Sequence, residues 1–123
     1  MAKLRILIVE DDPDGADVMN RMLIASGAET VAVGSAEEAI QTLETTQTPF
    51  DVAVIDLALP EMDGFELMRV LRDSIAFRQL ALIAVTAFHT PELKVQALEN
   101  GFDAYFAKPI DTTLFVRAID QLV

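Results

Sequence analysis

Polar side chains that can do chemistry follow four separate apolar runs of this sequence. Glu10 and Asp11 come directly after the first run, and Asp56 comes directly after another. Thr86 and Lys108 follow two later runs. In an open parallel sheet, ligands bind outside the carboxyl ends of the strands, where such residues would gather. The pattern therefore predicts one cleft that holds three carboxylates, a hydroxyl group and an ammonium group.

Three carboxylates in one cleft need a compensating cation. Two such charges about 4 Å apart repel by about 4 kcal/mol at an effective dielectric constant of about 20. Oxygen ligands with some retained water suit Mg²⁺ better than zinc, and Lys108 supplies a second positive charge. Such a cleft can hold a phosphoryl group, with an Asp as the nucleophile. Asp56 is the best candidate because it stands alone after its run, whereas Glu10 and Asp11 form a pair suited to holding the metal.

Five strand patterns alternate with five helix patterns along the chain. The strand patterns are the apolar, β-branched runs at residues 4–9, 30–33, 52–55, 80–85 and 104–107. Near-continuous runs of this kind are typical of parallel strands that are buried on both faces. The alternation predicts an α/β domain in which right-handed crossovers place helices on both faces of a parallel sheet.

Cap residues and apolar spacing mark the predicted helices. The first helix ends before Gly27 and has an apolar face made of Val18, Met19, Met22 and Leu23. Residues 35–38, Ser-Ala-Glu-Glu, match a capping box at the start of the second helix. Thr90 and Asp111 are the N-cap candidates of the last two helices.

The composition limits the class of protein. The 123 residues carry 9 Lys and Arg against 20 Asp and Glu, so the net charge is −11, and this length fits one domain over residues 1–123. The acidity argues against contact with nucleic acid or with a membrane surface. The chain has no Cys for a thiolate site and one His, which cannot build a multi-His metal site. Its apolar segments are too short for a signal peptide or a bilayer span, so we expect a cytoplasmic location.

Four motifs, in order along the chain, resemble the receiver domain of two-component response regulators. They are Ile8-Val9-Glu10-Asp11-Asp12, Asp56-Leu57-Ala58-Leu59-Pro60-Glu61-Met62-Asp63-Gly64, Val85-Thr86-Ala87 and Lys108-Pro109. The successive offsets from Asp11 to Asp56, Thr86 and Lys108 are 45, 30 and 22 residues. The resemblance covers roughly residues 4–122 and implies a doubly wound (βα)5 flavodoxin-like domain, whose five-stranded parallel sheet has the order 2-1-3-4-5.

The resemblance implies that Asp56 is the phosphoacceptor. It would take a phosphoryl group from a phosphohistidine on a sensor histidine kinase or a histidine phosphotransfer protein. Glu10, Asp11 and Asp56 match the Mg²⁺ ligands of the family, together with the backbone carbonyl of Ala58. Asp11 would be the more direct ligand and Glu10 would act through water. The domain would be a phosphorylation-controlled switch that catalyses only its own phosphoryl transfer and dephosphorylation, not an enzyme acting on other substrates.

The resemblance also implies the parts of a switch. Thr86, Ala87 and Lys108 would contact the phosphoryl group, and the bond that precedes Pro109 would be cis. Thr86 would move toward the new charge, and Tyr105 would turn inward into the space that Thr86 leaves. The surface of the fourth helix, fifth strand and fifth helix would then change toward an unknown output partner or a second copy of the chain. We expect Val95, Phe106 and Val116 on that surface, and His89 in an exposed loop.

Two positions depart from the commoner pattern of the family. Ala58 and Phe88 lie two residues after Asp56 and Thr86, where the family often has side chains that steer the hydrolytic water. Neither can orient water, and Phe88 could shield the phosphoryl group. We therefore expect a comparatively long-lived phosphorylated state.

Three other functions stay open at this point. A flavodoxin-like electron carrier would share the architecture, but the loop of residues 10–14, Glu-Asp-Asp-Pro-Asp, would repel its cofactor phosphate unless a cation intervened. An aspartate-dependent phosphohydrolase would place its nucleophile after the first strand in an Asp-x-Asp-x-Thr pattern, whereas residues 12–16 read Asp-Pro-Asp-Gly-Ala. A pure interaction module would leave the acidic site unused, and would neither bind Mg²⁺ nor become phosphorylated.

Overall fold

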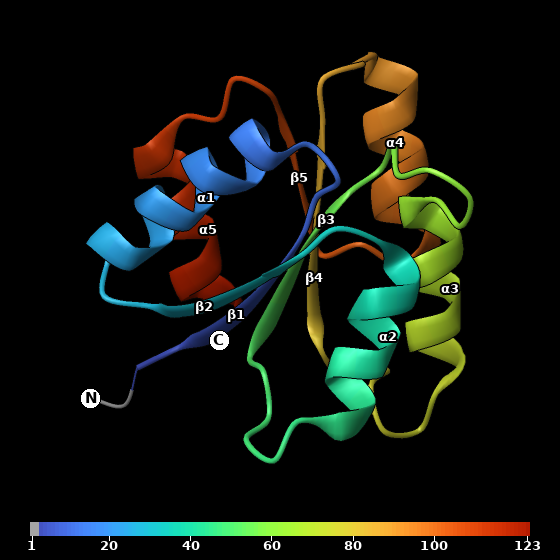
Figure 1. Ribbon diagram of the computed structural model, residues 1–123. Helices are drawn as coiled ribbons and strands as arrows, with labels where there is room; N and C mark the ends of the chain where they lie inside the picture. Colours follow the sequence, from blue (N-terminus) through green and yellow to red (C-terminus); the bar gives the residue numbers. More distant parts are fainter. Residues whose placement is uncertain (1–2) are drawn as a thin grey trace.

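Each apolar run becomes a strand of one parallel sheet. The computed structural model describes residues 3–123, so the first two residues of the predicted domain lie outside the described part. The strands are β1 (Arg5–Val9), β2 (Glu29–Val33), β3 (Val52–Asp56), β4 (Ala81–Thr86) and β5 (Ala104–Ala107). The helices are α1 (Pro13–Ala25), α2 (Ala36–Thr45), α3 (Gly64–Asp73), α4 (Pro91–Asn100) and α5 (Thr112–Leu122). The strand order is β2-β1-β3-β4-β5, which confirms the predicted flavodoxin-like fold (Figure 1).

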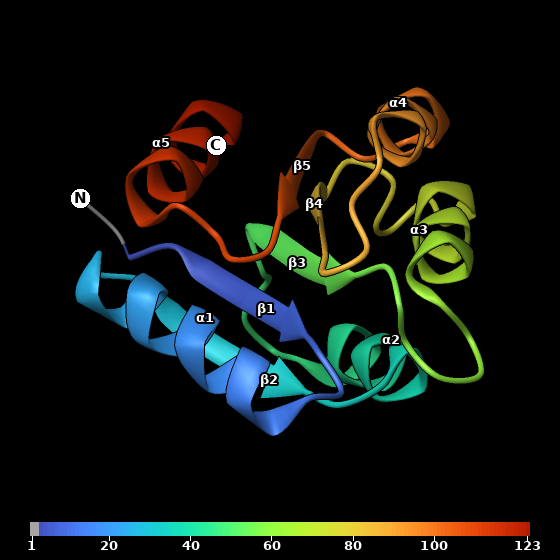
Figure 2. The same cartoon turned by 90° about the horizontal axis from the view of Figure 1, so that it is seen from above.

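Helices cover both faces of the sheet. Figure 2 shows α1 and α5 on one face and α2, α3 and α4 on the other. Alternate residues of β1 serve the two layers, because side chains along a strand point to opposite faces. Ile6 and Ile8 pack with Phe115 of α5, whereas Leu7 and Val9 belong to the core under α2, α3 and α4. No helix within residues 3–123 is both long and apolar enough to cross a bilayer.

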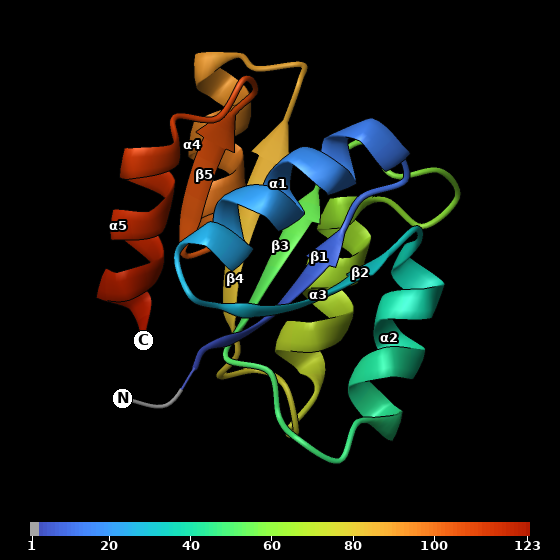
Figure 3. The same cartoon turned by 60° about the vertical axis from the view of Figure 1, so that its left-hand side comes forward.

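The strand register places the predicted site residues at one edge of the sheet. Val9 of β1 pairs with Ile55 of β3, so Glu10 and Asp56 come level with one another. Thr86 of β4 pairs with Ala107 of β5, so Lys108 lies one residue beyond. All four pairings are parallel, and Figure 3 shows the carboxyl ends of the strands at the same end of the molecule.

Two details of the helices differ from the prediction. Ser35 accepts a hydrogen bond from the Glu38 backbone N–H at 3.1 Å, but only this half of a capping box forms there, in a segment that the structure describes in full. The complete box is at the start of α3, where Asp63 accepts from the Glu66 N–H at 2.9 Å and the Glu66 carboxylate reaches back at 3.4 Å. Val18 is 51% exposed, so the buried face of α1 is narrower than predicted.

The expected output surface also needs correction. Phe106 packs edge-on against Phe115, with ring centroids 5.3 Å apart, in the layer under α1 and α5. Val116 is half-buried and lines the same groove as Leu23 of α1. Of the three apolar residues that we expected on the surface of α4, β5 and α5, only Val95 is exposed.

Arg72 joins several segments at the end of the molecule where the strands begin, opposite the carboxyl ends of the strands. Its Nε atom donates to the Gly101 carbonyl at 2.9 Å, and Nη1 donates to the carbonyls of Arg78 and Leu80 at 2.9 and 2.7 Å. Its Nη2 atom donates to the Asp103 carboxylate at 2.9 Å. One guanidinium group therefore joins the end of α3, the α3–β4 turn and the α4–β5 turn.

Gly64 is the position where α3 comes closest to the strand that carries Asp56. A Cβ atom at Gly64 would lie 2.5 Å from the Asp56 carbonyl oxygen and 2.7 Å from the Leu57 Cα atom. Backbone atoms cannot move aside as a flexible side chain can, so we expect Gly64→Ala to lower the free energy of unfolding by roughly 1–3 kcal/mol. Urea unfolding measures this change. Gly34→Ala is the matched control, since its Cβ atom would meet only the Glu38 carboxylate at 3.9 Å; an equal loss in both variants would contradict the argument.

Candidate functional site

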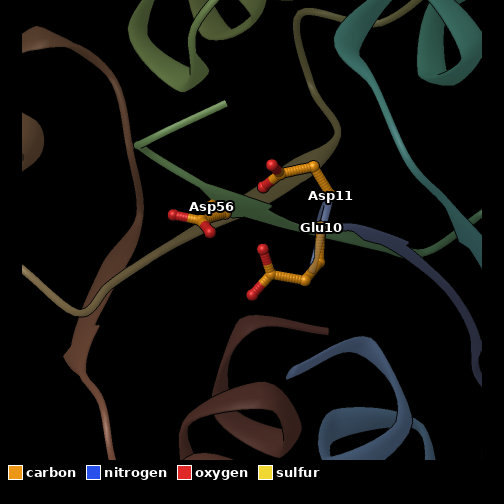
Figure 4. Close-up of side chains that lie close together, drawn as sticks. All are labelled: Glu10, Asp11 and Asp56. Carbon is orange, nitrogen blue, oxygen red and sulfur yellow. The ribbon is translucent and has the colours of Figure 1, made fainter. Parts of the chain in front are cut away.

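Three carboxylates gather where β1 and β3 end. Glu10 and Asp56 are 3% and 6% exposed, whereas Asp11 faces solvent. Each of the three offers an oxygen within 4.8 Å of the others (Figure 4). The predicted convergence of residues 10, 11 and 56 is therefore present, although Asp11 and Asp56 are far apart in the chain.

Local backbone contacts hold these carboxylates in place. Asp56 Oδ1 accepts a hydrogen bond from the Ala58 N–H at 2.9 Å, which bends the chain after β3. Glu10 Oε2 lies 3.5 Å from the Asp12 nitrogen. Gly15 of α1 leaves room for Glu10, since a Cβ atom there would lie 2.7 Å from Glu10 Oε1. Nothing near Gly15 in the chain signals that a carboxylate packs on it, so this contact could not be predicted from the sequence.

Lys108 closes the cluster from β5. Its Nζ atom forms an ion pair with Glu10 and lies 3.4 Å from Asp56 Oδ2. The Lys108 backbone N–H donates to the Thr86 carbonyl at 2.9 Å, which extends the pairing of β4 and β5 by one residue. The peptide bond between Lys108 and Pro109 is cis.

The pKa values of the clustered side chains reflect a shortage of positive charge beside the buried carboxylates. Burial, together with the nearby Asp56 carboxylate, raises the pKa of Glu10 to about 7 despite the Lys108 ammonium group. Burial also acts to raise the pKa of Asp56, but hydrogen bonds from Glu10 and the Ala58 N–H, together with Lys108, outweigh it and leave that pKa below its usual value. Burial acts to lower the pKa of Lys108, but Glu10 and Asp56 raise it overall.

This donor set fits Mg²⁺. It offers carboxylate oxygens with no nitrogen or sulfur ligand, and Mg²⁺ is bound in proteins through one or two carboxylates and retained waters. The unusually high pKa of Glu10 shows that a second buried negative charge is costly without a further cation. A divalent ion beside Asp11 and Asp56 would remove that cost.

The acidic run after β1 divides between two tasks. Glu10 and Asp11 face the cluster, whereas Asp12 is the N-cap of α1 and accepts from the Asp14 N–H at 3.2 Å. Asp14 lies in the first turn of that helix, where a negative charge is favourable. Asp17 pairs with Arg21 at 3.0 Å on the solvent face.

Thr86 and Tyr105 lie on the side of the cluster next to α4. Thr86 is buried, and its Oγ1 atom accepts a hydrogen bond from the Phe88 N–H at 3.0 Å. Ala87 follows in the exposed loop. Tyr105 is 8% exposed, so its ring lies inward without a phosphoryl group, whereas the resemblance implied an inward turn only after phosphorylation. Burial raises the pKa of its hydroxyl group. His89 is exposed as expected, but its Nδ1 atom lies 2.8 Å from the Tyr105 hydroxyl oxygen, a contact that the sequence analysis missed.

A family model of the response regulator receiver domain matches residues 6–120. An uncharacterised 14.6 kDa protein of Leptolyngbya boryana is 39% identical over 121 residues, which are 98% of this chain and 91% of that protein. The polar-differentiation response regulator DivK of Brucella ovis is 33% identical over 114 residues, which are 93% of this chain and 91% of DivK.

Solved structures agree with the family model. A sensor protein of Polaromonas is 35% identical, with a TM-score of 0.86 over 99% of this chain and 100% of that chain. The receiver domain of the sensor histidine kinase PA1611 of Pseudomonas aeruginosa, described with a magnesium ion coordinated in its active-site cleft, is 28% identical, with a TM-score of 0.87 over 98% of both chains. Receiver domains act as phosphorylation-controlled switches in two-component signalling. The chain belongs to the response regulator receiver domain family.

Proposed function

We propose that residues 1–123 form one receiver domain that accepts a phosphoryl group on Asp56 from a phosphohistidine of a sensor histidine kinase or a histidine phosphotransfer protein in the cytoplasm. An Asp56 oxygen would attack phosphorus, the phosphorus–nitrogen bond would break, and the imidazole would leave with the electron pair and take up a proton. The observation that carries this proposal is the placement of Asp56, whose carboxylate faces two other acids and lies 3.4 Å from the Lys108 Nζ atom.

The neighbours of Asp56 suit this transfer. The low pKa of Asp56 keeps its carboxylate ionised and ready to act as a nucleophile. Lys108 would move from its carboxylate partners to the phosphoryl oxygens, and Thr86 and Ala87 would donate hydrogen bonds to them from the end of β4. Preorganised positive groups of this kind stabilise the charge that spreads over the phosphoryl oxygens.

Glu10, Asp11 and Asp56 would hold Mg²⁺ together with the Ala58 carbonyl oxygen, as in our expectation from the sequence. When bound, the ion supplies a positive charge that neutralises the acids and the phosphoryl oxygens. Asp11 is exposed and can ligate directly, while the buried Glu10 is paired with Lys108 and can act through water. The magnesium-bound receiver domain of PA1611 supports this proposal.

The new charge would change the surface of α4, β5 and α5. A phosphoryl group adds about −1.5 to −2 charges beside Thr86, which now accepts its hydrogen bond from the Phe88 N–H. Thr86 would leave that partner for the phosphoryl oxygens, and this shifts the balance between two conformations that both exist beforehand. The exposed apolar residues Val95 and Leu98 of α4 and Leu114 of α5 suit contact with an output partner or a second copy of the chain.

Acetyl phosphate tests the proposal in the purified protein. We expect intact-mass spectrometry to find one added phosphoryl group in the presence of Mg²⁺ and almost none after chelation with EDTA, and peptide mapping to place it on Asp56. A pure interaction module remains the second candidate, because Glu10 and Lys108 already neutralise one another. Failure of both Mg²⁺ binding and labelling would favour that module and contradict the proposed function.

The lifetime of the phosphorylated state depends on access of water. Phe88 is 71% exposed, and neither Phe88 nor Ala58 has a side chain that can orient water. General-base assistance contributes about 10²–10⁴-fold at full effect, so we expect a flexible Glu at position 88 to speed dephosphorylation by roughly ten-fold. The loss of labelled Phe88→Glu protein after removal of acetyl phosphate measures this rate. Phe88→Leu is the control that stays apolar, and equal lifetimes of both variants and the wild type would contradict the hypothesis.

A further inference from the structure

The single His and the single Tyr of this chain meet beside the predicted switch. The His89 Nδ1 atom and the Tyr105 hydroxyl oxygen are 2.8 Å apart, and the ring centroids are 5.5 Å apart at an interplanar angle of 51°. His89 itself is exposed, whereas Tyr105 is buried. The imidazole of His89 therefore covers the outer end of the buried Tyr105 ring and is the hydrogen-bond partner of its hydroxyl group.

The contact joins two elements that the switch must move. His89 immediately precedes Thr90, the N-cap of α4, whose hydroxyl oxygen accepts from the Leu93 N–H at 3.0 Å. Tyr105 lies in the middle of β5, opposite Ala84. The hydrogen bond thus links the start of α4 to β5 from within the loop that follows Thr86.

We propose that His89 is a positioning residue of the switch, which holds the Tyr105 hydroxyl group so that the ring stays buried and the start of α4 stays next to β5. This inference rests on the proposed function for its consequence, but the contact itself does not need a phosphoryl group. A net hydrogen bond stabilises the conformation that contains it by about two- to ten-fold in population. His89 would therefore favour the inward conformation of Tyr105 before any phosphorylation.

The loop also couples the position of His89 to that of Thr86. Only Ala87 and Phe88 separate the two residues, and the Phe88 N–H now bonds to Thr86 Oγ1. A movement of Thr86 toward Asp56 would break this bond and let the loop that carries His89 rearrange together with Tyr105. The position of Tyr105 then depends on Thr86 through a hydrogen-bonded partner and not only through the space that Thr86 vacates.

Intrinsic fluorescence tests the positioning role directly, because the chain has one Tyr and no Trp. Acrylamide quenching, corrected with measured lifetimes, reports how exposed Tyr105 is in the unphosphorylated protein without Mg²⁺. We expect the quenching rate constant to rise at least two-fold in His89→Ala and to return toward the wild-type value in His89→Asn, which keeps a polar atom in the place of Nδ1. Equal constants in wild type and His89→Ala would overturn the inference.

A double-mutant cycle tests the coupling to phosphorylation. We expect His89→Ala to change the rate of labelling by acetyl phosphate about two- to ten-fold in the wild-type background, and to have no effect in a Tyr105→Phe background. An equal effect in both backgrounds, or none in either, would overturn the coupling. The outcomes separate the two proposals: failure of wild-type labelling contradicts the role of Asp56, whereas normal labelling with unchanged Tyr105 exposure contradicts only the role of His89.

Discussion

Asp56→Asn should take up no phosphate from acetyl phosphate under conditions in which every wild-type molecule gains one phosphoryl group. The amide oxygen can still accept the hydrogen bond from the Ala58 N–H, so the turn after β3 stays in place. An amide is not a nucleophile toward phosphorus, and the lost negative charge also weakens the proposed metal site. Intact-mass spectrometry after incubation with acetyl phosphate and Mg²⁺ measures the result.

The control for this variant is Asp120→Asn, which removes an exposed carboxylate from α5, away from the cluster. It should label as the wild type does. The melting temperature of Asp56→Asn, measured beside that of the wild type, shows whether the variant is folded. Stoichiometric labelling of a well-folded Asp56→Asn protein would remove Asp56 from its role.

Lys108→Met should slow labelling by about 100-fold without abolishing it. Loss of one preorganised group that stabilises transition-state charge costs about 10²–10³-fold in rate. Met keeps much of the length of Lys without the ammonium group, so Glu10 and Asp56 lose their shared partner. The rate of phosphate uptake from acetyl phosphate, followed by mass, measures the effect.

Mg²⁺ affinity distinguishes this role of Lys108 from a structural one. Removing a positive charge from beside the acidic cluster should strengthen Mg²⁺ binding several-fold, because like charges no longer compete for the carboxylates. A merely misfolded site would bind the ion more weakly. Calorimetric titration of both proteins with Mg²⁺ decides between the two, and Lys94→Met on the exposed side of α4 is the matched control.

The sheet could be predicted because its signals are local. Each buried strand is a continuous apolar run, and the alternation of runs with helix patterns leaves few topologies. The convergence of residues 10, 11 and 56 followed from that topology, since parallel strands end at one edge. The chemical roles that we assign to these residues stay predictions until labelling is measured.

The wrong predictions concern apolar residues whose burial depends on tertiary packing and not on the local sequence pattern. Val18 is apolar and next to Met19, but Met19, Met22 and Leu23 pack toward the sheet whereas Val18 faces solvent. Phe106 follows Tyr105 in a strand, so the two side chains must point to opposite faces of the sheet. They therefore cannot both lie on the side of the sheet next to α4. That error could have been avoided from the strand period alone.

The contacts that the sequence analysis missed lie between residues distant in the chain. Gly15 makes room for Glu10, Gly64 meets the backbone after Asp56, and the His89 ring reaches Tyr105. A glycine in a helix or a histidine in a loop has no local pattern that names its partner. Such contacts emerge only when the elements are packed together.

The hydrogen bonds of Arg72 bear on how α4 can move. The last residue of α4 is followed by Gly101, whose carbonyl oxygen is held by the same guanidinium group that binds the α3–β4 turn and Asp103. At the other end of α4, Thr90 directly follows His89, whose hydrogen bond to the Tyr105 hydroxyl group links this end of the helix to β5. We therefore expect any movement of α4 on phosphorylation to be larger at Thr90, next to the acidic site, than at Gly101.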